Sequence, residues 1–321
     1  MDLYQLRVLR ELADHGSITA TAEALGVTPS AVSQVIQSLQ QGFRAPLTMK
    51  DGRTTRVSDA GLALVDASAR VAIAVAEAEA SVDSYLQDET TSVSVAAFHS
   101  AALTFFPELA RAAASGDSPP VACSDEDVAQ DAFPALTARY DIVIAHRMAH
   151  AAPWPHERLV VVPLLREPMD VAMRADHPLA SKPRLRAQDV ADESWIEAHD
   201  GFSPADLLDS VAAAAGRPMR VAHRINDYST ATAIVAQSSS VTLLPRFTAT
   251  PSAESGVVLR ELTGIRSVRH IDLLMRPEQR ARQSVAKVEA LLQSIARTRQ
   301  DTVQSGEHGE HRARQSRPAL K

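Results

Sequence analysis

Hydrophobic residues recur at helical spacing in three runs near the start of the chain. These runs are Leu3, Leu6, Leu9 and Leu12 (or Val8), then Ile18, Ala22 and Leu25, then Val32, Val35, Ile36 and Leu39. Ser17 and Thr28 can cap helix N-termini, Pro29 suits a first helical position, and Gly26 permits a left-handed exit. The pattern predicts a helix over residues 1–14, followed by two helices joined by a tight turn over 17–41.

The third predicted helix carries a polar side opposite its hydrophobic one. Hydroxyl and amide groups on such a helix can contact base edges or phosphates in the major groove of DNA. The candidate contacts are Thr28, Pro29, Ser30, Ser33, Gln34 and Gln37. The alternative is an ordinary helical hairpin whose polar face is only solvated, because patterns of this kind are common.

The segment from Pro46 to Gly61 predicts a β-hairpin, because Asp51-Gly52 is a strong turn signal between two short strands. Arg53 and Arg56 lie on this hairpin and are candidate phosphate contacts. Three helices followed by such a hairpin form a winged helix-turn-helix, which we expect to occupy residues 1–57.

Residues 58–86 contain no proline and, after Gly61, no glycine, so the sequence predicts one long alanine-rich helix. A narrow apolar seam repeats along it at Leu62, Val65, Ala69, Ala72 and Ala76. Such a seam suits a partner helix, and we interpret residues 58–91 as a dimerisation helix with a hinge. The alternative is a helix packed on its own domain.

From residue 92 the pattern alternates between short apolar strands and helices. The predicted strands cover 92–98, 140–145, 160–165, 169–174, 194–198, 219–225, 240–245 and 269–276, and a last helix covers about 279–298. This alternation predicts parallel sheets with helices on both faces. We expect the polar residues 299–321 to be a disordered tail.

The order of these residues resembles the LysR-type transcriptional regulators. The resemblance runs without a gap from Met1 to Leu39, then through Pro46 and Leu47 and from Gly52 to Gly61. Local departures are Arg44, Thr48, Gln34 and Gln40, where the family usually has Gly, Phe, Arg and an acidic residue. The resemblance implies a two-lobed α/β effector domain of the periplasmic-binding-protein type over 92–298, with lobe 1 at about 92–162 and 267–298 and lobe 2 at about 166–262.

In a two-lobed domain, the ligand binds between the lobes at the carboxyl ends of strands, where helix N-termini present free N–H groups. The residues that fall there are Phe98, His99, Ser100, Ala101, Gly201, Phe202, Ser203, Tyr228 and Thr230. Ser100 and Ser203 could bond a small-molecule effector, or each could be a plain helix cap. For His99 the sequence favours a purely structural role over a ligand role.

Composition and charge limit the remaining possibilities. The chain has 321 residues, 45% hydrophobic content and a net charge of −6, while residues 1–57 carry six basic and five acidic side chains, a net of 6 − 5 = +1. A nearly neutral DNA-binding domain favours paired copies on paired half-sites, so we expect a homodimer and, from the resemblance, a dimer of dimers.

The sequence gives no sign of catalysis or of membrane insertion. It lacks nucleotide-binding glycine loops, serine-hydrolase elbows and metal-ligating spacings, so we expect no cofactor and no metal. Cys123, the single cysteine, cannot form an intramolecular disulfide, and we expect it to be buried or half-buried. No apolar run or leader is evident, so we expect a cytoplasmic location. The alternative function is a solute-binding or enzyme domain with an accessory helix-turn-helix used for protein interaction.

Overall fold

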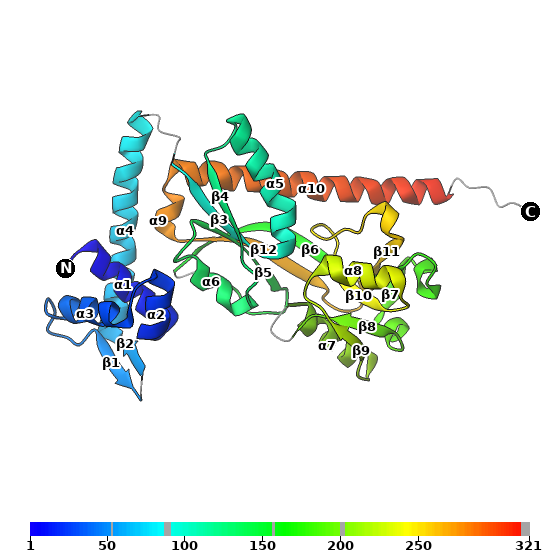
Figure 1. Cartoon of the computed structure of the whole chain (residues 1–321), viewed down its shortest axis with the longest axis horizontal. Coiled ribbons are helices and arrows are strands. Elements are labelled where there is room, and N and C mark those ends of the chain that lie inside the picture. Colours follow the sequence, from blue (N-terminus) through cyan, green and yellow to red (C-terminus); the bar gives the residue numbers. More distant parts are fainter. Residues whose placement is uncertain (53, 87–90, 156–157, 200–202, 316–321) are drawn as a thin grey trace, which may run out of the picture.

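The computed structural model describes residues 1–52, 54–86, 91–155, 158–199 and 203–315. Its first part is a winged helix-turn-helix, as the sequence predicts, and we call it the head (Figure 1). The head contains α1 (Leu3–His15), α2 (Ile18–Leu25), α3 (Pro29–Gln40) and the antiparallel pair β1 (Thr48–Asp51) and β2 (Thr54–Val57).

Local capping explains why the head helices begin and end where they do. The side chains of Ser17 and Thr28 accept hydrogen bonds from the backbone of α2 and α3, and Gly26 has a positive φ of 64°. The helices enclose a small core that includes Val8, Leu9, Leu12, Val32, Ile36 and Leu39. The helical spacing puts Leu3 on the same inward side as Leu6 and Leu9, but this expectation was wrong for Leu3, whose side chain is 51% exposed near the start of α1.

Two residues, Gln40 and Gly61, hold the wing against the adjoining helices. Gln40 accepts a hydrogen bond from the Leu47 N–H and donates to the carbonyls of Phe43 and Ala45, so it fixes the loop before β1. An acidic residue could accept from Leu47 but could not donate to the two carbonyls. At Gly61 a Cβ atom would lie 2.1 Å from the Leu47 carbonyl oxygen, which explains the glycine.

Helix α4 (Asp59–Leu86) is the long helix that the sequence predicts. Its predicted dimer seam is turned partly inward: Val65 belongs to the core of the head, and Ala72 and Ala76 face α1 and α9 (Pro277–Arg280). The alternative of packing on its own chain therefore holds for these residues. A different side of α4 is exposed, where Val71 and Val82 are 41% and 58% accessible.

The rest of the described chain forms two lobes around one continuous, mixed sheet. The strands are β3 (Val93–Ala97), β4 (Val121–Asp125), β5 (Ile142–Met148), β6 (Val160–Arg174), β7 (Arg184–Arg186), β8 (Ser194–Glu197), β9 (Arg220–Arg224), β10 (Val241–Pro245), β11 (Val257–Thr263) and β12 (Val268–Met275). The helices are α5 (His99–Ser115), α6 (Phe133–Leu136), α7 (Ser203–Ala215), α8 (Tyr228–Gln237) and α10 (Gln283–Gln315), with short 3-10 turns at Gln130–Ala132, Pro178–Ser181, Ala187–Val190 and Ala253–Ser255.

The sheet is parallel within the lobes, as the alternation predicts, and antiparallel at the strands that cross between them. The neighbours run in the order β4-β3-β5-β12-β6-β10-β8-β9, and β11 pairs with β6 and β7. Pairs within each lobe, such as β3 with β5 and β8 with β9, are parallel, whereas β12 and β6 pair antiparallel with their neighbours. The antiparallel strands are those that carry the chain between lobes.

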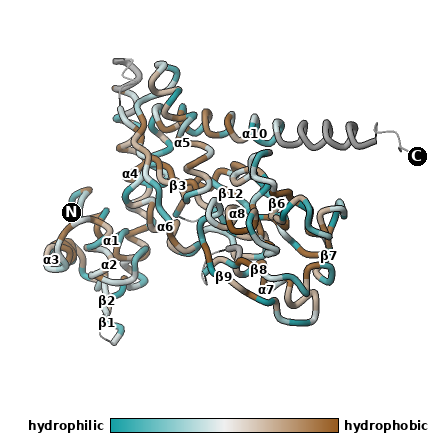
Figure 2. The backbone as a smooth tube through the Cα atoms, turned by 45° about the vertical axis from the view of Figure 1, so that its right-hand side comes forward, coloured by the Kyte–Doolittle hydropathy of each residue, from teal (hydrophilic) through white to brown (hydrophobic). Residues whose placement is uncertain are grey.

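Strand β6 is one strand of 15 residues, where the sequence predicted two. It pairs with β12 as far as Pro168 and with β10 from Met169, so the chain passes from lobe 1 to lobe 2 at this point. Each lobe has its own hydrophobic core, and Figure 2 shows hydrophobic segments in both. The polar run Arg166-Glu167 in the sequence concealed the continuity of the strand.

Helix α10 continues to Gln315, so residues 299–315 are helical and the predicted tail was wrong up to that residue. Good helix-forming residues and the absence of proline within 283–315 allow the continuation. Figures 1 and 2 show α10 running from lobe 1 across the top of the molecule towards lobe 2. Arg299 on α10 donates a hydrogen bond to the carbonyl of Phe247.

Two other expectations concern exposure. Cys123 lies on β4 at the edge of the sheet and is exposed, so the expected burial was wrong. Within the described residues, no helix has the length and apolar character needed to cross a lipid bilayer.

Candidate DNA-binding and effector-binding sites

The outer side of α3 is exposed and polar. Val32, Ile36 and Leu39 are buried beneath it, and the predicted contacts Thr28, Pro29, Ser30, Gln34 and Gln37 are exposed, with Ser33 half-buried at the flank. The Ser33 hydroxyl donates to the Pro29 carbonyl at 3.0 Å, which leaves its oxygen free to accept. The structure therefore places the predicted side chains on one accessible surface.

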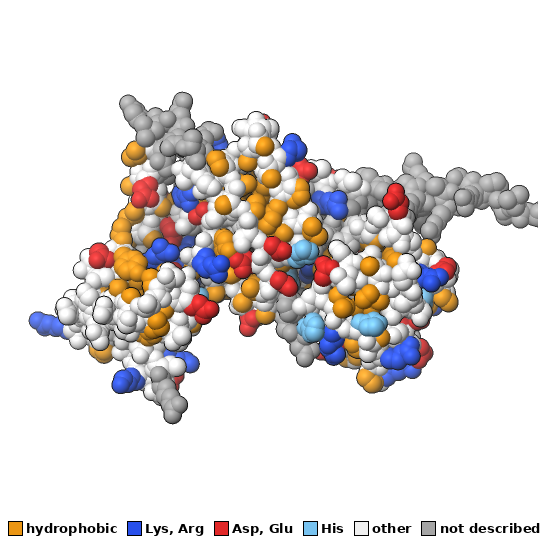
Figure 3. All heavy atoms as spheres, in the orientation of Figure 1, with side chains coloured by type: hydrophobic (Ala, Val, Ile, Leu, Met, Phe, Trp, Pro, Cys, Tyr) orange, Lys and Arg blue, Asp and Glu red, His pale blue; other side chains and the backbone are white. Residues whose placement is uncertain are grey.

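The wing adds positive charge beside this surface. Figure 3 shows Lys and Arg side chains at the lower end of the head, around β1 and β2. Arg56 pairs with Asp51 across the turn at 3.0 Å, and both side chains are about 60% exposed (64% and 59%). Such an exposed pair is weak, so the guanidinium can exchange Asp51 for a phosphate. Arg53 lies outside the described residues.

Ion pairs attach α1 of the head to lobe 1. Glu11 is fully buried and meets Arg276 at 2.6 Å, while Arg10 meets Glu278 at 2.5 Å. Burial would raise the pKa of Glu11, but its contacts with His15 and Arg276 lower it below the ordinary value. The carboxylate therefore stays charged in the interior of the joint.

The carboxyl ends of strands from both lobes meet at a small cleft. It is lined by Phe98, His99, Ser100, Asp127, His146, Ala198, Asn226, Tyr228 and Arg269, and encloses about 40 Å³. The sequence predicted four of these residues, Phe98, His99, Ser100 and Tyr228. Typical ligand pockets enclose about 300–1,000 Å³, so in this arrangement of the lobes the cleft is too small for such a ligand.

Arg269 fills the space behind the cleft. The side chain is 1% exposed; its Nε donates to Glu167 at 2.8 Å, and one terminal nitrogen donates to Ser100 at 3.0 Å and Thr248 at 2.6 Å. Burial would lower the pKa of Arg269, but the charge of Glu167 raises it. Ser100, the second residue of α5, therefore accepts a hydrogen bond from an internal cation, and its contact with an effector stays a prediction.

His99 joins the two lobes at the mouth of the cleft. Its Nδ1 lies 2.8 Å from Asp125 in lobe 1, and its Nε2 lies 3.5 Å from Asp227 in lobe 2. The hydrogen bond with Asp125 raises the pKa of His99, partial burial opposes this, and the charges of Asp125, Asp227 and Asp127 add to it. The protonated ring therefore attracts carboxylates from both lobes.

The other predicted effector residues lie elsewhere. The Ala101 side chain is fully buried in the core of lobe 1, and the Thr230 hydroxyl donates to Asp227, so neither side chain lines the small cleft and their contact with an effector stays a prediction. Helix geometry sets both positions, because Ala101 lies on the side of α5 that faces the sheet and Thr230 lies one turn from the Asp227 cap. Gly201 and Phe202 lie outside the described residues, as does the side chain of Ser203 at the start of α7.

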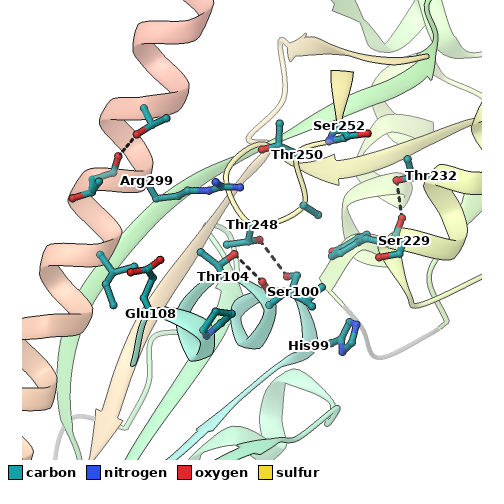
Figure 4. A pocket seen from close by; sticks show the side chains of 18 of the residues that line it. His99, Ser100, Thr104, Glu108, Ser229, Thr232, Thr248, Thr250, Ser252 and Arg299 are labelled. Carbon is teal, nitrogen blue, oxygen red and sulfur yellow. Dashed lines mark hydrogen bonds between the residues drawn. The ribbon is translucent and has the colours of Figure 1, made fainter. Parts of the chain in front are cut away.

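A much larger pocket lies on the α10 side of Ser100. It encloses about 800 Å³ between α5, α8, α10 and the segment from Thr248 to Ser255 (Figure 4). His99, Ser100 and Tyr228 line both this pocket and the cleft. Of the remaining lining residues, Arg299 and Thr302 were not predicted because they come from the helix segment that was expected to be disordered. In the part of the chain that the structure describes, no group of three or more His, Cys, Asp or Glu is placed to hold a metal ion.

Comparisons with known proteins agree with this architecture. Residues 3–62 match the family model described as bacterial regulatory helix-turn-helix protein, lysR family, and residues 87–298 match the LysR substrate binding domain. The chain belongs to the LysR family. It is a transcriptional regulator whose second domain is of the effector-binding type.

Individual relatives of this LysR-family chain are distant. A probable nitrogen assimilation transcriptional activator of Synechocystis sp. is 24% identical over 253 residues, which cover 78% of this chain and 81% of that protein. Among solved structures, a full-length OxyR variant from Pseudomonas aeruginosa is 18% identical, with a TM-score of 0.59 and coverage of 92% of this chain and 95% of that one. The regulatory domain of Synechocystis CcmR in complex with 2-PG is 15% identical, with a TM-score of 0.54 and coverage of 64% and 97%.

Proposed function

We propose that this regulator reads specific double-stranded DNA with the outer face of α3 and contacts phosphates with the wing. The observation that carries the proposal is the exposed polar surface of Ser30, Gln34 and Gln37 above a fully apolar inner face. These groups can bond base edges without any rearrangement of the head. The protein acts by binding and not as an enzyme.

The protein functions as a homodimer, and as a dimer of dimers when bound to paired sites. The exposed side of α4, with Val71, Ala74, Ala78 and Val82 at helical spacing, provides the interface. Val71→Glu together with Ala78→Glu should separate the subunits in sedimentation velocity, because unpaired carboxylates would be buried in the interface. An unchanged sedimentation coefficient would place the interface on another surface.

A small molecule controls the protein by entering the cleft between the lobes. The complex of the CcmR regulatory domain with 2-PG supports a small-molecule effector. Entry must part His99 from Asp227 and expose the Ser100 and Arg269 groups, which favours an effector with an acidic or hydroxyl group. The lobes transmit the change to the head through the Glu11 and Arg276 ion pair.

Footprinting of the purified protein on DNA upstream of its own gene tests the DNA-binding part. We expect protection of two half-sites about one or more helical turns apart. Gln37→Ala should weaken the protection, whereas Gln237→Ala, which removes an equally exposed glutamine at the end of α8, should leave it unchanged. Equal protection by both variants would show that α3 does not read this DNA.

A further inference from the structure

The large pocket on the α10 side has the features of a ligand site in its own right. The apolar walls are formed by Leu103, Pro107, Pro251 and, on α10, Leu291 and Ile295. The Leu103 side chain is 57% exposed, whereas most leucines of the two lobes are buried. Its volume of about 800 Å³ is within the range of small-molecule pockets. The pocket can therefore bury a substantial apolar group.

The hydroxyl groups around the pocket are acceptors rather than donors. Thr104, Thr232 and Thr250 each donate their proton to a carbonyl four residues earlier in the chain. Thr298 and Thr302 on α10 do the same. Their oxygen lone pairs remain available to a ligand that carries hydroxyl or amide protons.

Arg299 supplies the positive charge of the pocket. Its Nε donates to the Phe247 carbonyl at 2.8 Å, which fixes the direction of the side chain, and Figure 4 shows the guanidinium extending from α10 towards the loop at Thr248 and Thr250. Among the side chains that the structure describes, which on α10 end at Thr302, none makes a hydrogen bond or ion pair with its two terminal nitrogens. The other arginine of the lining, Arg111, is already paired with Glu108 at 2.8 Å. A guanidinium held in this way suits a carboxylate.

We propose that this pocket is a second small-molecule site, distinct from the cleft at the strand ends, and that it binds an amphipathic carboxylate. Arg299 bonds the carboxylate, and Leu103, Pro107 and Ile295 contact the apolar body. Because α5 and α10 belong to lobe 1 while α8 and the Thr248 loop join lobe 2, the bound molecule touches both lobes. Occupancy therefore favours one arrangement of the lobes over another.

Fluorescence titration with 11-(dansylamino)undecanoic acid tests the proposal on the full-length protein. We expect one binding site per chain and an affinity that falls about tenfold or more in Arg299→Gln, because a charge-assisted hydrogen bond is lost. Arg297→Gln, two positions earlier on α10 and exposed outside the pocket, should bind as the wild type does. The corresponding primary amide of the probe should bind wild type and Arg299→Gln equally.

Two further variants distinguish binding in the pocket from binding in the cleft and from non-specific electrostatic attraction of the probe to the protein. Ile295→Glu should prevent binding, since it places a carboxylate in the apolar wall, whereas Asp127→Asn, which changes the cleft alone, should have no effect. Unchanged affinity in Arg299→Gln, equal losses in Arg297→Gln, or a loss in Asp127→Asn would each overturn the proposal. None of these experiments measures DNA binding by α3, so a negative result for the pocket leaves the DNA-binding proposal unchanged.

Discussion

The head and the region between the lobes use polar side chains in opposite ways. On α3, Gln34 and Gln37 are exposed and share no side-chain hydrogen bond with another described residue, so DNA can bond them without breaking an internal bond. Between the lobes, Glu167, Arg269 and Ser100 are buried and bonded to one another. A ligand there must exchange internal bonds for new ones, which makes the head a recognition surface and the lobes a switch.

The largest expected effect comes from a substitution in the buried network between the lobes. Arg269→Met keeps an unbranched side chain like the stem of arginine but leaves Glu167 charged and without its cation, which should cost about 3–5 kcal/mol of stability. Urea unfolding followed by tryptophan fluorescence measures it, since Trp154 and Trp195 lie in the two lobes.

The matched control is Arg184→Met, which removes an arginine that pairs with Glu261 but is 71% exposed. Loss of such a surface pair should cost less than about 1 kcal/mol. Similar unfolding midpoints for the two variants would show that burial does not distinguish the Arg269 network.

Two substitutions in the exposed wing of the head should change DNA affinity in opposite directions. Arg56→Ala should weaken binding to all DNA sequences alike and reduce the slope of log affinity against log salt by about 1. Asp51→Asn should strengthen binding, because it releases Arg56 from its ion pair. A loss confined to a few base pairs in Arg56→Ala would instead mean that the wing reads bases.

The smallest effect concerns pH at the mouth of the cleft. The pKa of His99 is raised in the folded protein, so protonation of the ring stabilises the fold. This stabilisation is complete below the pKa of the unfolded chain, about 6.5, and it is lost as the pH rises through the pKa of the folded protein. The half-exposed ring limits this contribution to less than about 1 kcal/mol. NMR titration should place the His99 pKa above 6.5.

His99→Gln should remove that part of the pH dependence of unfolding, and His223→Gln, an exposed histidine on β9, should not. The buried His146 behaves in the opposite way, since desolvation and then the charge of Arg269 lower its pKa well below the ordinary value. A His99 ring that titrates below 6.5 would remove the electrostatic contact between the lobes.

Sequence could predict the head because its elements depend on nearby residues. Thr28, Pro29 and the spacing of Val32, Ile36 and Leu39 define α3 within twelve residues of chain. The residues around Ser100 could not be predicted in this way, because Glu167, Thr248 and Arg269 come from separate segments and look like solvated charges or turns in sequence. Nothing in the strand VRHIDLLM singles out Arg269, because His270 and Asp272 beside it are also polar.

The same limit explains the errors in α4 and α10. The repeat of Val65, Ala72 and Ala76 predicts an apolar face, but periodicity does not say whether that face meets another subunit or the same chain. Likewise, the polar residues after Thr298 predict exposure, and exposure is compatible with a helix as well as with disorder.

The most direct test uses the double variant Ser33→Ala with Gln34→Ala. Its affinity for the footprinted DNA is measured by fluorescence anisotropy at fixed salt, and the urea midpoint of the same sample measures its stability. Each good base contact is worth about 1–3 kcal/mol, so we predict that specific affinity falls at least about tenfold while stability changes by less than about 0.5 kcal/mol. Unchanged affinity for the specific site would contradict the account of the head as the recognition surface.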